Sequence, residues 1–562
     1  MMATPVEEIR VRREIEFGDP TPNAVGRNAR VSPEGCVVHL EATSAKRLLW
    51  SGEDLLDVKL PTGTRVVYPK PTIPGIPDRD EGIRYALKHP EEMEPLEALL
   101  RSGMKVTIAI DDVSLPLPKM PRPDIRESVL TIVLNLLAEK GVSDVHIIVA
   151  TSFHRRMEEF ELRHAVGSRI YDAYAPDRLY NHDGEAPDGM VELGRTELGE
   201  RVRINRRAAE SDLLIYVNIN LVSMDGGSKS IGVGLCDYAS LRAHHTPQTI
   251  LKCNSYFDHT HSALTLSCNR MAKVINSHLK VFHIETAVNN AMFNPAMAFF
   301  AKNEDKWNAL DKTSFRVAQS VLRALPRKLK RKILFSIPAS YAVTAVHAGA
   351  TLPTHEKTLA YCYQQYAVPV EGQSDVAIFG IPFISPYNVN SILNPLLVQV
   401  LALGYFFNMY RGMPVVKKNG VMILTHPLYD DFDPRHHPSY IEFFHRIMPE
   451  TNDSFVLQQK YEAEFAHNPE YIEMYRHGYA YHGVHPFYMW YWGENGRAHC
   501  GKVIVVGAED QKAARVMGWD CASSMDEALE MAHSHVGRTP SVTHVHIPPI
   551  NMVDVSGVPE SI

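Results

Sequence analysis

The sequence predicts an α/β protein with two α/β domains, mostly parallel sheets and a cleft between the domains. Short apolar, β-prone runs alternate with amphipathic helical segments in two separate parts of the 562-residue chain. This alternation is typical of parallel sheets with right-handed crossovers. With 45% hydrophobic and 22% charged residues, the chain is also long enough to bury two or three cores.

The first α/β unit occupies the first half of the chain. A strand is expected at residues 106–110, followed by the Pro-rich loop DDVSLPLPKMP. Residues 124–140 have apolar side chains at helical spacing, with a proline before them and a glycine after them. A second strand is expected at 145–150, before a further loop and helix. A third, buried strand is expected at 213–221.

The second α/β unit begins with an expected strand at 374–382 and a helix at 391–410. The segments GVMILTHP and KVIVVGAED read as further strands, and a helix is expected from Gln511. The apolar run 392–407 contains asparagine, proline and glutamine, which favours a packed helix over a membrane span.

These patterns give four expected regions. Residues 1–45 are polar without a clear period and read as an N-terminal extension. An N-terminal domain is expected at 46–300 and a C-terminal α/β domain at 341–562. A basic helical connector at 301–340, which contains RKLKRK, is expected between them.

Composition narrows the expected partners. A net charge of -7 and a pI near 6.5 give no general attraction for nucleic acid, so a small-molecule partner is favoured. Seven scattered cysteines without a CxxC pair predict neither a disulfide framework nor a structural zinc site. The first residues lack an apolar core, so no secretory signal is expected. We therefore expect a reducing, cytoplasmic location.

Polar side chains follow several of the expected strands. Asp111 and Asp112 follow the first strand, His154 the second and Lys229 the third. Ligands of open α/β sheets bind outside the carboxyl ends of the strands, so these residues are expected to converge.

The most informative segment is the turn after the third strand. Gly226 and Gly227 permit a tight turn that presents Lys229, and the pair His244 and His245 lies about sixteen residues later. An isolated GGSK is a weak signal, but its spacing from the histidine pair suggests a held, reactive cofactor.

Over about residues 45–545 the chain resembles the nickel-dependent lactate racemases. The family's DxTRPxP loop is similar to DDVSLPLP at 111–118, its GTHRPMTEEE element to ATSFHRRMEEFE, and its NHD segment to residues 181–183. The stretch GRTELGERVRINRRAAESDLLIYVN also resembles the family pattern. The family's SGGxK motif falls on 225–229, and its downstream histidine falls on His245.

The resemblance implies a nickel cofactor, a nickel-pincer nucleotide of the pyridinium-3,5-bisthiocarboxylic acid mononucleotide type. Sulfur and imidazole donors in a planar arrangement suit Ni(II). His245 would be the nickel ligand, with His244 its nearest competitor, and His154 would be the catalytic base. Residues 46–300 would anchor the cofactor, and cofactor-maturation enzymes would be partners. The implied cofactor-binding residues are Asp112, Ser114, Gly226, Gly227 and Lys229, with Lys229 as the covalent attachment point.

The function implied by the resemblance is racemisation or epimerisation of a 2-hydroxy acid or a related hydroxyl-bearing substrate, through proton-coupled hydride transfer. The cofactor would carry the hydride, and the protein would orient the substrate and move the proton. One alternative is an oxidoreductase or redox isomerase that uses one face of the substrate. Another is a non-catalytic nucleotide-binding homologue without metal.

Three positions depart from the family pattern. Ile219 stands where the second catalytic histidine is expected, and Leu115 and Leu396 replace an arginine and a lysine. Each lost charge-assisted contact with a carboxylate is worth about 1.5 to 3 kcal/mol. The substrate is therefore expected to be larger, less acidic or held by other residues.

Some other side chains have simpler interpretations. His182 is expected to be structural. Trp490 and Trp492 lie near the place of a family site tryptophan, but a core aromatic cluster explains them equally well.

Overall fold

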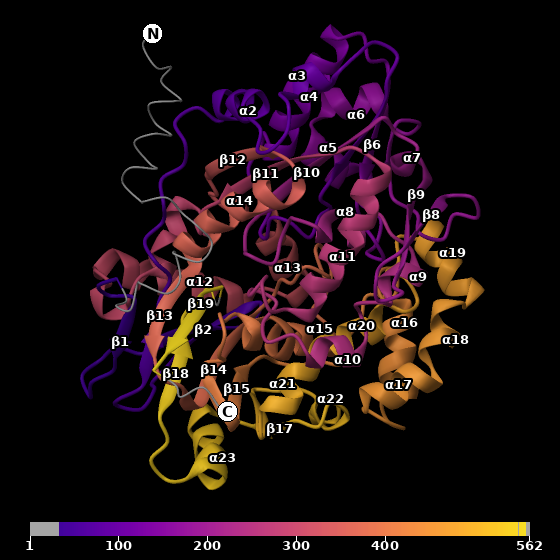
Figure 1. Cartoon of the computed structure of the whole chain (residues 1–562). Coiled ribbons are helices and arrows are strands. Elements are labelled where there is room, and N and C mark those ends of the chain that lie inside the picture. The colour runs from indigo at the N-terminus through magenta and orange to yellow at the C-terminus, as the bar shows by residue number, and fades with distance from the viewer. Residues whose placement is uncertain (1–32, 549, 558–562) are drawn as a thin grey trace.

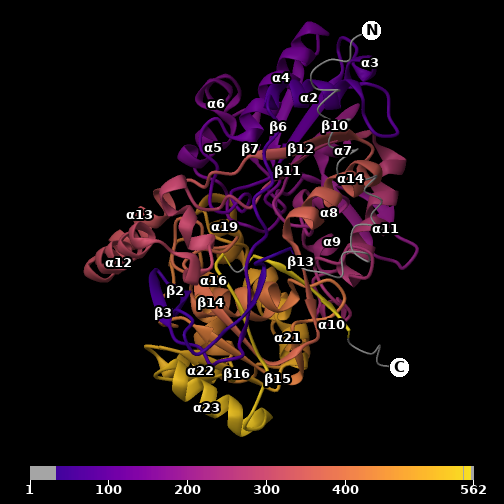
Figure 2. The ribbon, with the colours of Figure 1, turned by 90° about the vertical axis from the view of Figure 1, so that its left-hand side faces the viewer.

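Two large sheets, with six and nine strands among the described residues, organise the chain in a computed structural model. The structure describes residues 33–548 and 550–557. Most neighbouring strands are parallel, which confirms the predicted α/β class. In both Figure 1 and Figure 2 the six-stranded sheet lies above the nine-stranded sheet.

The six-stranded sheet has the order β12-β11-β10-β5-β6-β7. All its neighbours are parallel except β11 and β12, which are antiparallel. The three strands expected from the sequence appear as β5, β6 and β10, side by side. The bounds are β5 Lys105–Ile110, β6 Asp144–Val149, β7 Leu179–Asn181, β10 Leu213–Asn220, β11 Val281–Val288 and β12 Val343–Gly349.

Helices connect and cover these strands. The helix expected at 124–140 is α4, whose N-terminus is capped by the Asp124 carboxylate accepting from the Arg126 amide. A short antiparallel hairpin, β8 with β9, lies at 190–205. The bounds are α2 Arg79–Lys88, α3 Leu96–Leu99, α4 Ile125–Glu139, α5 Glu159–Val166, α6 Ser168–Tyr174, β8 Met190–Arg195, β9 Arg201–Asn205, α7 Arg206–Ala209, α8 Lys229–Gly234, α9 Tyr238–Leu241, α10 Pro247–Leu251, α11 Ala263–His278 and α14 Thr351–Tyr366.

The nine-stranded sheet has the order β1-β4-β18-β14-β15-β16-β17, with β2 pairing with both β14 and β3. The expected strand at 374–382 coincides with β14. Hydrophobic side chains from β14, β15 and β16 pack under α23. The bounds are β1 Val37–His39, β2 Arg47–Gly52, β3 Asp54–Val58, β4 Arg65–Val67, β14 Ser374–Pro382, β15 Val416–Thr425, β16 Lys502–Val506, β17 Asp520–Ala522 and β18 Val542–Val545.

The nine-stranded sheet includes strands from both sides of the domain boundary that was expected at residue 46. Strands β1 to β4, at 37–67, join the sheet built mainly from 374–545, although a boundary was expected at residue 46. Residues 1–32 of the expected extension lie outside the described residues. A short strand's local pattern does not reveal a partner hundreds of residues away, so the pairing was not visible in the sequence.

The expected connector at 301–340 contains two helices, α12 and α13. On α13, Lys330 pairs with Asp54 at 2.6 Å and Arg331 pairs with Glu53 at 2.9 Å. Part of the basic motif therefore binds the β2–β3 turn. The bounds in this region are η1 Pro295–Ala301, η2 Glu304–Lys306, α12 Ala309–Ala324 and α13 Arg327–Ser336.

The apolar run 392–407 forms α15 followed by the π-helix η3, and both are buried. No helix within the described ranges is long and apolar enough to cross a membrane. The remaining bounds are β13 Ala367–Glu371, α15 Pro395–Gln399, η3 Val400–Phe406, α16 Pro438–Glu442, η4 Phe443–Ile447, α17 Ser454–Lys460, α18 Glu462–Ala466, α19 Pro469–His477, α20 His485–Trp492, α21 Glu494–His499, α22 Gln511–Val516, α23 Met525–Val536 and β19 Met552–Ser556.

Candidate functional site

A carboxylate and a histidine meet where β5 and β6 end. The Nδ1 atom of His154 lies 2.7 Å from the Oδ2 atom of Asp112. Ser114 holds the other carboxylate oxygen, with its backbone amide at 2.9 Å and its hydroxyl at 2.5 Å from Oδ1. Because β5 and β6 are adjacent and parallel, the loops that follow them reach the same edge of the sheet.

The loop that bears Asp112 is fixed from behind by Arg126. Its guanidinium donates to the backbone carbonyls of Asp111 and Asp112, at 2.9 and 2.8 Å. The same guanidinium pairs with Asp124 at 2.9 Å. Arg126 is buried and its charge is matched, so it holds the loop and is not available to a substrate.

Asp112 is suited to orient His154. Burial opposes ionisation of this carboxyl, but the neighbouring His154 and the hydrogen bonds from Ser114 outweigh it and keep the pKa below its usual value. With Nδ1–H donated to the carboxylate, the Nε2 atom of His154 is left as an acceptor. The His154 side chain is 26% exposed, so a small molecule can reach it.

Asp111 faces the neighbouring strand instead. Its carboxylate accepts hydrogen bonds from the Asn218 side chain at 2.9 Å and from the Ile219 amide at 2.7 Å. Burial raises its pKa to about 7. Asp111 therefore ties the β5 loop to the end of β10.

The glycine pair forms the turn that precedes α8. Gly226 and Gly227 have φ of +79° and +64°, the left-handed region that favours glycine. The Gly227 amide donates to Glu285 at 2.7 Å, and Glu285 in turn contacts the Nδ1 atom of His355 at 3.0 Å. A Cβ atom on Gly227 would lie 2.5 Å from the His355 ring. The close approach to β11 and α14 therefore requires glycine.

This turn presents Lys229 as the first residue of α8. Lys229 is half-buried, and its charge acts on buried Asp225 and on His245. Burial raises the pKa of Asp225, and the nearby Lys229 charge opposes that rise. Asp225 also accepts from the backbone amides of Leu221 and Val222, at 3.1 and 3.0 Å. The lysine thus lies between an acidic turn and a histidine.

His245 is held in an aromatic environment. Its ring lies 5.3 Å from the Trp492 ring in a stacked arrangement and 5.1 Å from the Tyr488 ring. Its Nδ1 atom is 2.8 Å from that of His244. Burial, reinforced by His244, lowers the pKa of His245 well below its usual value. A neutral imidazole of this kind can donate a lone pair to a metal.

The residues that the sequence did not indicate come from the C-terminal part. His485, the first residue of α20, packs edge to face on His154 with ring centroids 5.5 Å apart. Its Nδ1 atom is 2.6 Å from the Tyr440 hydroxyl. Tyr387 and Tyr481 also face His154, with centroids at 5.3 and 6.0 Å.

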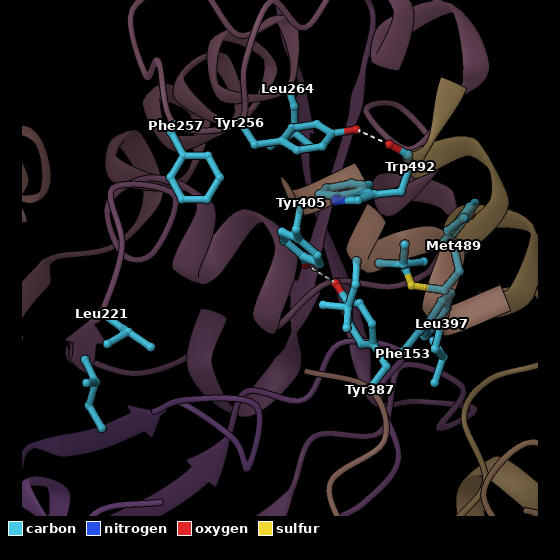
Figure 3. Close-up of a cluster of buried hydrophobic side chains, with 14 of the residues drawn as sticks. Phe153, Leu221, Tyr256, Phe257, Leu264, Tyr387, Leu397, Tyr405, Met489 and Trp492 are labelled. Atoms are coloured by element: carbon cyan, nitrogen blue, oxygen red, sulfur yellow. Dashed lines mark hydrogen bonds between the residues drawn. The ribbon is translucent and has the colours of Figure 1, made fainter. Parts of the chain in front are cut away.

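An aromatic wall thus surrounds the imidazole of His154. Figure 3 shows Tyr387 bonded to Tyr405, and Trp492 lying beside Tyr256. The sequence of α20, HPFYMWYW, gave no indication of this role, because a histidine in an apolar helix resembles a core residue. Trp492 stacks on His245 and also packs against Tyr256 in the core. It therefore fits both interpretations made from the sequence, a site tryptophan and a core aromatic residue.

The three departures from the family pattern have different surroundings. Ile219 is fully buried within β10, and Leu396 is fully buried in α15. Leu115 is half-buried and lines a pocket. His182 bonds the Cys236 carbonyl at 2.9 Å and is buried, which agrees with its expected structural role.

Metal donors are sparse near this site. No group of three or more histidine, cysteine, aspartate and glutamate side chains that could hold a metal occurs in the part of the chain that the structure describes.

Comparisons with known proteins connect the N-terminal part of the chain with one family. Residues 51–256 match the lactate racemase N-terminal domain family. The lactate racemase of Lactiplantibacillus plantarum is 27% identical over 176 residues, which cover 30% of this chain and 39% of that protein. The lactate racemase of Thermoanaerobacterium thermosaccharolyticum is 25% identical over 173 residues, covering 30% and 38%. The aligned part thus spans less than half the length of these curated relatives.

The fold resembles that of a lactate racemase over a larger part of the chain than the sequence match covers. The structure of the lactate racemase apoprotein from Thermoanaerobacterium thermosaccharolyticum superposes with a TM-score of 0.58 and 16% identity, covering 91% of this chain and all of that one. The N-terminal part of the chain is thus similar in sequence to lactate racemases, and the chain shares the fold of the lactate racemase apoprotein. The sequence match lies in its N-terminal part, and the likeness over the rest is one of fold.

Proposed function

We propose that this protein is a racemase or epimerase that acts at a hydroxyl-bearing carbon with a nickel-pincer nucleotide bound at Lys229 and His245. The observation that carries the proposal is the Asp112–His154 pair, 2.7 Å apart, at the same sheet edge as the Lys229 turn. The match of residues 51–256 to the lactate racemase N-terminal domain supports the same class of reaction.

The residues around His245 fit a bound polar group. Two buried polar atoms in its surroundings have no hydrogen-bond partner among the described residues: Trp492 Nε1 and the Tyr488 hydroxyl. The buried hydroxyl of Ser228, next to Lys229, also has no hydrogen-bond partner among the described residues. Buried polar atoms are rarely left unsatisfied, so these atoms support a ligand at this place.

In this proposal His245 supplies the metal ligand and Lys229 the covalent attachment, while Asp112, Ser114 and the glycine turn line the cofactor site. When bound, such a cofactor would supply the hydride chemistry, by accepting a hydride from the carbinol carbon and returning it. The chain supplies binding, orientation and proton transfer.

His154 is the proposed base. Its Nδ1–H is engaged by Asp112, so its Nε2 atom is the one that can accept the substrate hydroxyl proton. Asp112 acts as a positioning residue, because it fixes the ring and stabilises the protonated imidazole. The proton would return through the same Nε2 atom when the carbonyl is reduced.

His485 is the proposed second polar group at the substrate, a hydrogen-bond donor to the substrate oxygen, and it takes the place of the histidine missing at Ile219. Burial, reinforced by His154 and other histidines, lowers its pKa well below the usual value, so its ring is neutral at pH 7. Burial raises the pKa of Tyr440, so the phenol keeps its proton and can donate it to Nδ1 of His485. The imidazole proton would then lie on Nε2, as a donor beside the acceptor of His154.

Co-expression with the cofactor-maturation enzymes and nickel tests the cofactor. Intact mass and nickel content would be measured for the wild type, Lys229→Ala and, as a matched control, Lys252→Ala, which changes an exposed lysine. We expect a mass adduct and nickel in the wild type and the control, and no adduct in Lys229→Ala. An unmodified, nickel-free wild type would instead support the non-catalytic alternative.

The loaded enzyme then tests the reaction. Racemisation scrambles the stereocentre without net oxidation, whereas an enzyme that uses one face accumulates the ketone. We expect scrambling of the stereocentre without accumulation of the ketone.

The proposed location is the reducing cytoplasm, which suits a chain whose seven cysteines are all free.

A further inference from the structure

An apolar pocket adjoins the proposed site. It opens between the loops that follow β5 and β10 and the end of β14, with α13 and η3 on its other sides. Residues from both sheets line it, including Leu115, Leu221, Phe257, Phe383, Leu401 and Tyr405. Its walls therefore combine parts of the chain that lie almost 300 residues apart.

Two contacts join this pocket to His154. Ser114 lines the pocket, and its hydroxyl binds the Asp112 carboxylate that holds His154. Tyr405 also lines the pocket, and its hydroxyl is 2.6 Å from that of Tyr387, whose ring packs on His154. One residue thus separates His154 from the pocket lining on each path, Asp112 on the first and Tyr387 on the second.

The pocket offers no positive charge. Its lining, within the described residues, contains no lysine, arginine or histidine, and Asp225 is its one carboxyl group. Burial raises the pKa of Asp225. A substrate carboxylate placed here would lose its hydration beside an acidic group without a cation to compensate, which is strongly unfavourable.

The size of the pocket suits a ring or a branched chain. Its cavity volume is about 160 Å³. An apolar cavity of roughly 150 Å³ accommodates benzene, so a phenyl-sized group fits. Burying such a group stabilises the complex by about 25 cal/mol for each Å² of apolar surface removed from water.

We propose that this pocket binds the apolar arm of an uncharged, hydroxyl-bearing substrate, so that the protein acts on a hydrophobic secondary alcohol instead of a short 2-hydroxy acid. The proposal rests on the proposed function, because it names the substrate class of the same site. Leu115 is central to it, since this side chain lines the pocket and belongs to the loop that carries Asp112 and Ser114.

Binding of two matched probes to the full chain tests the substrate class. Mandelate and 1-phenyl-1,2-ethanediol share a phenyl ring and a benzylic hydroxyl, but only mandelate has a carboxylate. Isothermal titration calorimetry would give both dissociation constants. We expect the diol to bind at least about tenfold more tightly, because the carboxylate finds no cation in the pocket. Mandelate binding as tightly as the diol would overturn the proposal.

A change of charge at the pocket should reverse this preference. Leu115→Arg places a guanidinium at the half-buried position on the loop, while Leu310→Arg makes the same change at an exposed position on α12. We expect Leu115→Arg to favour mandelate over the diol and Leu310→Arg to leave the preference as it is. An unchanged preference in Leu115→Arg would show that the probes bind elsewhere.

Filling the pocket provides a test without a change of charge. Met297→Trp enlarges a half-buried side chain of the lining, and Met474→Trp makes the same change on exposed α19. We expect Met297→Trp to weaken binding of the diol at least fivefold while the melting temperature stays close to that of the control. Undiminished binding in the folded Met297→Trp variant would contradict the assignment.

The failure of this inference can be told apart from failure of the proposed function. The binding experiments need no cofactor, and the Lys229 adduct needs no substrate. An adduct with no preference for the diol would leave the cofactor proposal standing and remove the substrate class. A preference for the diol without an adduct would leave an apolar binding site and remove the racemase.

Discussion

The edge of the six-stranded sheet and the wall opposite it differ in chemistry. The edge carries ionisable groups on short loops after parallel strands: Asp112, His154 and Lys229. The wall, from β14, η3 and α20, is aromatic and aliphatic, and His485 is the ionisable group that it turns toward His154. In the proposed function, the first side provides proton transfer and cofactor attachment, and the second encloses the bound molecule.

The comparison with relatives follows the same division. The match to the lactate racemase N-terminal domain covers 51–256, which includes every residue on the charged edge. The wall residues lie outside that range, and the likeness there is one of fold. Two of the three departures from the family pattern, Leu115 and Ile219, nevertheless lie within the matched range.

The first and largest expected effect concerns the charged edge. His154→Gln keeps a hydrogen bond to Asp112 but removes the proton acceptor. General-base catalysis contributes roughly 10² to 10⁴-fold, so we expect a loss of about 10³-fold in kcat of the loaded enzyme. The measurement is the initial rate of stereochemical exchange.

Cofactor loading provides the control for this variant. His154→Gln should carry the same Lys229 adduct and nickel content as the wild type, because His154 is not proposed to bind either. If His154→Gln exchanges stereochemistry at the wild-type rate, His154 is not the base. The chemical difference between the two regions would then have no catalytic meaning.

A smaller effect is expected on the wall. His485→Gln preserves a hydrogen bond to Tyr440 but displaces the N–H donor proposed to face the substrate oxygen, so we expect kcat to fall roughly ten- to a hundredfold. His544→Gln is the matched control, because it removes another buried imidazole that does not line the pocket. A fall in kcat with little change in KM distinguishes a hydrogen bond made in the transition state from packing. An unaltered kcat would make the wall purely a binding surface.

The smallest effect concerns stability at the charged edge. The folded state raises the pKa of Asp111 from 3.8 to about 7, so the folded chain keeps this proton to higher pH than the unfolded chain. The contribution of Asp111 to stability is therefore greatest at low pH and is lost as pH rises through about 7. Asp111→Asn removes this dependence.

Urea midpoints at pH 5 and pH 8 measure the difference. We expect the wild type to lose more stability than Asp111→Asn between these two values. A parallel change in both proteins would mean that Asp111 is charged throughout, and that its contacts with Asn218 and the Ile219 amide compensate fully for burial.

Much of the charged edge could be predicted from the sequence. The strands that appear as β5, β6 and β10 are marked by apolar runs, and parallel neighbours bring the loops after them together. The contact of His154 with Asp112 follows from that rule. The glycine turn was also visible, because a positive φ leaves a local sequence signal.

The wall could not be predicted in this way. His485 reaches His154 across more than 300 residues, and nothing in HPFYMWYW distinguishes a histidine that faces a site from one in a core. Strands β1 to β4 likewise joined the nine-stranded sheet against the expected boundary at residue 46. The roles proposed for Lys229 and His245 stay predictions from the resemblance, supported by where the two side chains lie.

The sequence by itself determined the α/β class, the strands of the charged edge and the residues that follow them, because hydrophobic period and turn chemistry act over a few neighbouring residues. The tertiary structure decided what those residues face. The aromatic wall, the apolar pocket beside Leu115 and the pairing of His154 with His485 arise from packing between distant segments, and that packing depends on shape and burial across the whole fold.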